Sequence, residues 1–108
     1  MTPVATITPA DLAARLAQGE SFVLLDVREP VELALARIDG VRAIPLGELV
    51  RRAGELDPDL PTVCICHHGI RSARAAGHLA SSGFRAVFNL AGGIDRWSAE
   101  VDARIPRY

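Results

Sequence analysis

The sequence predicts an α/β fold with a mainly parallel sheet, because short apolar runs alternate along the chain with segments of helical periodicity. Its 108 residues allow one domain, residues 1–108, and not two. Apolar residues make up 49% of the chain and charged residues 23%, which is the usual balance of a globular protein.

The first quarter of the chain contains a strand, a helix and a second strand. Residues 4–7 form the first predicted strand. Thr8 then caps a helix that has Pro9 at its first position and ends at Gly19. The continuous apolar run 22–25 is typical of a strand that is buried on both faces of a parallel sheet.

Prolines divide the middle of the chain. Pro30 opens a short helix, residues 41–44 form a short strand, and Pro45 closes that strand. A helix follows, with Leu46, Leu49 and Val50 on one side. The loop 57–61 is rich in turn-forming residues.

Two more strand and helix pairs complete the pattern. Residues 63–66 form a strong apolar strand, and a helix follows from about residue 71 to 82, where Gly83 stops it. Residues 86–89 form the last strand. A double-glycine turn at 92–93 leads into the final helix.

Charge and cysteine content exclude several classes of protein. Twelve basic residues oppose thirteen acidic ones, so no excess positive charge is available for nucleic acid or a membrane surface. No apolar run approaches the roughly 20 residues that a membrane helix needs. Cys64 and Cys66 are one residue apart and cannot cross-link distant segments. With no signal peptide visible, we expect a cytoplasmic protein with reduced thiols.

The segment that should carry chemistry, called below the Cys66 loop, is Cys66-His67-His68-Gly69-Ile70-Arg71-Ser72. It joins a buried strand to a helix, so it lies at the edge of the sheet where α/β proteins bind ligands. The helix N-terminus favours a thiolate, and Gly69 lets backbone N–H groups turn inward to bind an anion. We therefore expect a reactive Cys66, open to solvent, in a cup of hydrogen-bond donors.

Such a cup suits two chemistries, phosphate-ester hydrolysis and the transfer of a sulfur atom. Cysteine phosphatases of the tyrosine and dual-specificity types have five residues between cysteine and arginine. Here four residues separate Cys66 from Arg71, which makes a smaller cup. The shorter loop favours sulfur transfer.

The pattern Cys-x-x-Gly-x-Arg between strand and helix resembles the active-site loop of rhodanese-type sulfurtransferases. Residues 25–30 with Glu32, residues 38–45, and residues 89–94 with Trp97 are similar to other signatures of that family. The resemblance covers about residues 22 to 97. It implies a three-layer fold, with a five-stranded, mostly parallel sheet and helices on both faces.

The resemblance also implies a mechanism. Cys66 would take a sulfane sulfur from a donor such as thiosulfate or a persulfide and pass it to cyanide or a thiol. Asp26 and Arg28 match the motif residues that help to organise the loop. The implied substrate-binding residues are His67, His68, Gly69, Ile70, Arg71 and Ser72. No cofactor or metal is implied, and the partners are the small donor and acceptor, with a sulfur-relay protein as a further candidate.

Several alternatives stay open at this point. The chain could be a rhodanese-like interaction module whose main role is to dock a partner. Cys64 is expected to be a packed, inert thiol rather than a resolving cysteine. A zinc site is disfavoured because the ligands are too close in sequence. Since His67 and His68 stand where thiosulfate-specialised members have Arg or Lys, we expect weak use of thiosulfate.

Overall fold

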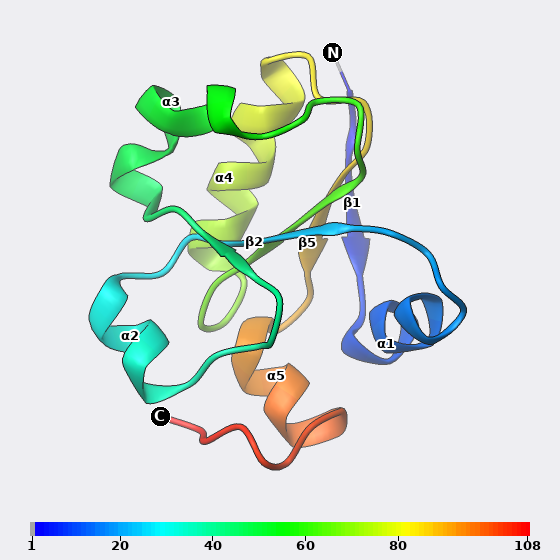
Figure 1. Cartoon of the computed structure of the whole chain (residues 1–108), viewed down its shortest axis with the longest axis vertical. Coiled ribbons are helices and arrows are strands. Elements are labelled where there is room, and N and C mark those ends of the chain that lie inside the picture. Colours follow the sequence, from blue (N-terminus) through cyan, green and yellow to red (C-terminus); the bar gives the residue numbers. More distant parts are fainter. Residues whose placement is uncertain (1) are drawn as a thin grey trace.

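The computed structural model describes residues 2–108 and contains one sheet with the strand order β1-β5-β4-β2-β3 (Figure 1). The strands are β1 (Val4–Ile7), β2 (Val23–Asp26), β3 (Arg42–Ala43), β4 (Thr62–Ile65) and β5 (Val87–Leu90). All four neighbouring pairs are parallel. The predicted α/β class is confirmed, and the sheet is wholly parallel because helix-containing crossovers lead from each strand to the next.

The helices are α1 (Pro9–Ala17), α2 (Pro30–Leu35), α3 (Leu49–Arg52), α4 (Ile70–Ser81) and α5 (Gly93–Glu100). The helix predicted around Leu46, Leu49 and Val50 is not one regular α-helix. α3 has only four residues, and the 3₁₀ turns Leu46–Glu48 and Ala53–Glu55 flank it. Each turn contains a glycine, a poor helix former, which accounts for the interruption.

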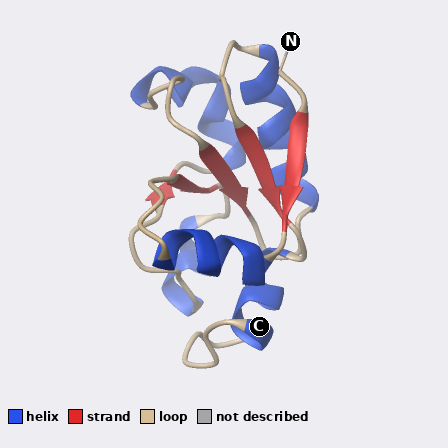
Figure 2. Cartoon of the chain, turned by 90° about the vertical axis from the view of Figure 1, so that its right-hand side faces the viewer, coloured by secondary structure: helices blue, strands red, loops and turns tan. Residues whose placement is uncertain are grey.

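Two hydrophobic clusters pack on opposite faces of the sheet, and Figure 2 shows helices on both sides of the strands. β4 divides its side chains between them. Cys64 joins the cluster that contains residues of α3 and α4, whereas Val63 and Ile65 join the cluster of α1 and α5. Because β4 is buried on both faces of the sheet, its sequence contains a continuous apolar run.

The carboxyl ends of the central strands meet at one edge of the sheet. Asp26 ends β2 beside Ile65 of β4, so Cys66 follows at the same edge. The C-terminal segment returns to this region, and in Figure 1 the end of the chain lies next to α2. No helix within residues 2–108 is long and apolar enough to cross a membrane.

Candidate active site

Cys66 follows β4 directly, where the chain turns toward α4. The backbone N–H of Gly69 donates a hydrogen bond to Cys66 Sγ over 3.1 Å. The Ser72 hydroxyl oxygen lies 3.2 Å from the same sulfur. The sulfur is therefore held at the N-terminal end of a 12-residue helix, where partial positive charge favours an anion.

The prediction that Cys66 is open to solvent is wrong for this conformation. The Cys66 side chain is 1% exposed and packs in one cluster with Ala75 and Ala76 of α4. Within residues 2–108, Gly69 supplies the one backbone amide that donates to Sγ, where the sequence predicts a ring of several. The sulfur is turned inward, toward Gly69 and Ser72, and in this conformation it is closed to a donor molecule.

Two glycines are required by the shape of the Cys66 loop. Gly69 has φ +104°, a left-handed conformation that side chains disfavour, and it precedes the first residue of α4. A Cβ on Gly93 would overlap the carbonyl oxygens of Cys66 and His67. Those oxygens accept hydrogen bonds from the backbone N–H groups of Ile94 and Asp95 in the first turn of α5. Gly93 therefore allows α5 to hold the start of the loop.

Arg71 does not bond to the sulfur. Its guanidinium donates two hydrogen bonds to the Glu32 carboxylate of α2, over 2.6 and 2.8 Å. The bond from Arg71 lowers the pKa of Glu32 to about 2, and that carboxylate in turn raises the pKa of Arg71. The positive charge of Arg71, which the sequence predicts for the cup of donors around Cys66, is thus largely neutralised by the Glu32 carboxylate in this conformation.

The two histidines stack instead of turning toward the sulfur. The His67 ring lies 3.9 Å from the Tyr108 ring, centroid to centroid, at an interplanar angle of 6°. The His68 ring lies 3.8 Å from that of His67. His67 Nε2 is buried and has no hydrogen-bond partner among residues 2–108. The histidines thus form the outer part of the site.

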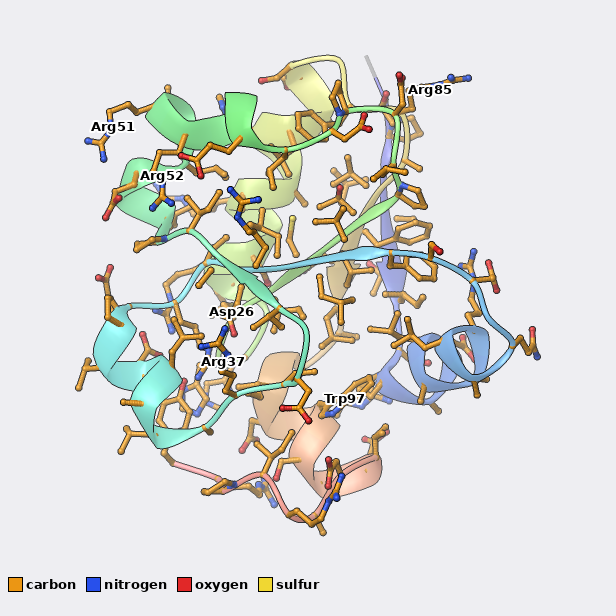
Figure 3. The ribbon with its side chains drawn as sticks, viewed as in Figure 1. Asp26, Arg37, Arg51, Arg52, Arg85 and Trp97 are labelled. Carbon is orange, nitrogen blue, oxygen red and sulfur yellow. The ribbon has the colours of Figure 1, made fainter. Side chains whose placement is uncertain are left out.

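Asp26 and Arg28 form a fully buried ion pair of 2.7 Å at the end of β2. Figure 3 shows Asp26 at the centre of the molecule. Arg28 also donates to the backbone oxygens of Glu32 and Ala36 and to the Tyr108 hydroxyl. Within residues 2–108, the Asp26 side chain makes no hydrogen bond to the Cys66 loop. The pair reaches the loop only indirectly, because Arg28 holds α2 and Glu32 binds Arg71.

The structure thus divides the predicted site residues into two groups. Cys66, Gly69 and Ser72 converge on the sulfur. The others point outward or bind neighbouring elements, and Ile70 is 76% exposed at the start of α4.

The sequence did not assign roles to Tyr108 and Asn89, which both contact the site. The Tyr108 hydroxyl donates to Glu32 over 2.8 Å. Asn89 of β5 bonds to Gly69 and Ser72. Asn89 lies in one of the segments that resemble the family signature, which is the signal that could have found it. Tyr108 is 76 residues from Glu32, and no local pattern links them.

Cys64 is packed in the core and is 0% exposed. Burial, together with the nearby Cys66 sulfur, raises the pKa of Cys64 to about 12, so this thiol stays protonated. Both cysteines are free. Within residues 2–108, no group of three or more His, Cys, Asp or Glu side chains is placed to hold a metal ion.

The chain is similar to known proteins over most of its length. The family model of the rhodanese-like domain matches residues 8–100. The putative sulfur carrier protein YrkF of Bacillus subtilis is 42% identical over 83 residues, which are 77% of this chain and 45% of YrkF. Thiosulfate sulfurtransferase GlpE of Pseudomonas putida is 34% identical over 98 residues, covering 88% of this chain and 86% of GlpE.

A solved structure is also similar to this chain over most of its length. The crystal structure of a rhodanese-related protein from Thermoplasma volcanium has a TM-score of 0.81 and 36% identity, and the match covers 90% of this chain and 93% of that one. The chain spans only 27% to 64% of the length of several curated relatives that it matches. Together, the loop geometry, the parallel sheet and these matches place the chain in the rhodanese-like domain family.

Proposed function

We propose that this protein is a sulfurtransferase that moves a sulfane sulfur from thiosulfate or a persulfide to cyanide or a thiol. The hydrogen bond from Gly69 N–H to Cys66 Sγ, at the start of α4, is the observation that carries the proposal. It places a nucleophilic sulfur beside a backbone donor where negative charge is stabilised. The sulfurtransferases named among the relatives support the same general chemistry.

The reaction proceeds in two balanced steps. The Cys66 thiolate attacks the sulfane sulfur of thiosulfate, a new S–S bond forms, and sulfite leaves with the electron pair of the broken S–S bond. The persulfide anion on Cys66 is then attacked at its outer sulfur by cyanide or a thiolate. Thiocyanate or a new persulfide leaves, and the Cys66 thiolate returns.

The other predicted site residues keep roles in this proposal. Gly69 and Ser72 face the sulfur directly. His67 carries an unbonded, buried Nε2 that can bind a donor once the loop opens. His68, Ile70 and Arg71 line the outer side, where the donor approaches. Asp26 and Arg28 organise the loop through α2.

A sulfur-relay protein is the partner class that fits this chemistry, and the relatives named as sulfur carrier and adenylyltransferase/sulfurtransferase support it. The two free cysteines also fit a reducing compartment, so a cytoplasmic location belongs to the proposal.

Thiocyanate production tests the proposal. The purified protein is given cyanide with either thiosulfate or a low-molecular-weight thiol persulfide. We expect turnover with at least one donor, complete loss in Cys66→Ser, and full activity in the matched control Cys64→Ser. Loss of activity in Cys64→Ser alone, or turnover that survives in Cys66→Ser, contradicts the assignment of Cys66.

A second candidate, a rhodanese-like interaction module, is favoured by one observation. Cys66 is 1% exposed, while the apolar Ile70 of the same loop and Val31 of α2 are 76% and 68% exposed. A docking module needs exposed apolar residues and has no use for an accessible thiol. Absence of turnover with every donor would favour this function.

A further inference from the structure

Asn89, a residue of β5, contacts the Cys66 loop at two points. Its Nδ2 group donates to the backbone oxygen of Gly69 over 3.0 Å, and its Oδ1 accepts from the Ser72 hydroxyl over 2.6 Å. A carbonyl oxygen can only accept, so the bond to Gly69 fixes which end of the amide faces Ser72. Asn89 therefore presents an acceptor, and not a donor, to the Ser72 hydroxyl.

This arrangement determines which of the two groups, the Ser72 hydroxyl or the Cys66 thiol, donates the hydrogen bond between them. Ser72 has a single hydroxyl hydrogen, and that hydrogen is engaged by Asn89. At 3.2 Å from Sγ, the hydroxyl oxygen can then act only as an acceptor, so the thiol S–H is the donor. The contact suits a neutral thiol. A thiolate or persulfide anion requires Ser72 to turn its hydrogen away from Asn89 and toward the sulfur.

We propose that Asn89 is a positioning residue that acts through the Ser72 hydroxyl to oppose ionisation of Cys66 in the resting protein. The step concerned is loss of the thiol proton to a base in the solvent, with no change in oxidation state. Ser72 is fully buried, so its hydroxyl is divided between two partners, Asn89 and the sulfur. The purpose of this effect rests on the sulfur-transfer function proposed above. In that function, Asn89 keeps the Cys66 nucleophile protonated until a donor molecule opens the loop.

Other charged and titratable groups lie on the elements that carry or adjoin the Cys66 loop. They lie on the strand before Cys66, the loop after it and the elements packed around them: Cys64, His67, His68, Arg71, Glu32, Asp26, Arg28 and Asp95. A test of Asn89 must therefore keep these groups the same in all the proteins that it compares and isolate the path through Ser72.

A double-mutant cycle in a Cys64→Ser background meets this requirement. The four proteins are the parent, Asn89→Leu, Ser72→Ala and the double variant. Leucine has nearly the size of asparagine but neither polar group. For each protein, the rate of Cys66 alkylation by iodoacetamide is followed by mass spectrometry across pH. The plateau rate reports access to the thiol, and the midpoint of the profile reports its ionisation.

We expect Asn89→Leu to lower the midpoint by about half a pH unit to one unit, because the freed Ser72 hydroxyl can donate to the thiolate. In the Ser72→Ala background the same substitution should leave the midpoint unchanged. Asn89→Leu also removes the hydrogen bond from Asn89 to Gly69. Because this loss occurs both with Ser72 and with Ser72→Ala, its effect on the midpoint cancels in the cycle. An equal shift in both backgrounds, or no shift while Ser72 is present, overturns the proposal.

Two further variants keep the test decisive. If Asn89→Leu does not fold, Asn89→Ala removes the same polar groups and enters the same cycle. Ser72→Thr retains a hydroxyl and should restore sensitivity to the residue at position 89. Alkylation needs no sulfur donor, so the cycle gives its answer even if the protein proves unable to transfer sulfur.

Discussion

Arg71, in the Cys66 loop, is bound to Glu32 of α2 through two hydrogen bonds of 2.6 and 2.8 Å. The Glu32 side chain is only 16% exposed, and its second oxygen also accepts from the Tyr108 hydroxyl. The arginine that would attract an anionic donor thus has a carboxylate as its first partner. This pairing gives a physical reason, beyond the two histidines, to expect weak use of thiosulfate.

Replacement of Glu32 by glutamine should strengthen the use of thiosulfate. Without the carboxylate, the Arg71 charge is free to attract the doubly negative donor, so we expect KM for thiosulfate to fall several-fold with little change in kcat. Steady-state thiocyanate production measures both constants. Glu48→Gln is the matched control, because Glu48 pairs with Arg51 and Arg52 of α3, and Figure 3 shows Arg51 extending outward. An increase in KM in Glu32→Gln would contradict this role.

The ion pair between Arg71 and Glu32 should make the free energy of unfolding depend on pH in the acid range. Arg71 holds the pKa of Glu32 at about 2, below its value in the unfolded chain, so the folded state binds fewer protons. The contribution, about 1–2 kcal/mol, is full above the unfolded pKa of about 4.3 and disappears as the pH falls toward 2. Urea unfolding of wild type and Glu32→Gln should show a stability difference at pH 7 that closes across this range. A constant difference would contradict the prediction.

The Tyr108 ring should restrict opening of the Cys66 loop. It stacks on His67, the residue after Cys66, and such stacking contributes about 0.5–1.5 kcal/mol. Tyr108→Leu should therefore raise the alkylation rate of Cys66 about 2- to 10-fold in a Cys64→Ser background. Tyr108→Phe keeps the ring and should alkylate at nearly the parent rate. Equal rates in the leucine and phenylalanine variants would show that the stack does not control access.

Gly93 should be intolerant of even one methyl group. A Cβ there would overlap the carbonyl oxygens of Cys66 and His67, and the residue has a positive φ of 62°. Gly93→Ala should lower the free energy of unfolding by at least about 2 kcal/mol. Gly77→Ala is the control, because a Cβ at this α4 position meets nothing within 4 Å and alanine favours helix. Similar stabilities of the two variants would contradict the predicted overlap.

The order of elements and the location of the chemistry could be predicted from sequence because both follow from local pattern. Apolar runs and capping residues are properties of short segments, and a loop after a buried strand must lie at the sheet edge. The boundaries of β2, β4, α4 and β5 differ from the predictions by one residue. The strand expected over 41–44 is reduced to two residues, since it pairs only with the last residues of β2.

The inward position of the sulfur could not be predicted in the same way. It depends on the contacts of Cys66 with Ser72 and on Asn89, which comes from another strand. The partner of Arg71 and the stacking of Tyr108 are likewise set by tertiary packing between distant segments. A single domain over residues 1–108 stays a prediction.

The most direct measurement is the mass of the intact protein after treatment with thiosulfate or a small persulfide, followed by peptide mapping. Formation of a stable persulfide predicts a gain of one sulfur atom on the Cys66 peptide, reversed by cyanide and absent from Cys66→Ser. A protein that never gains this mass with any donor, or that carries it on Cys64, would contradict the proposed chemistry.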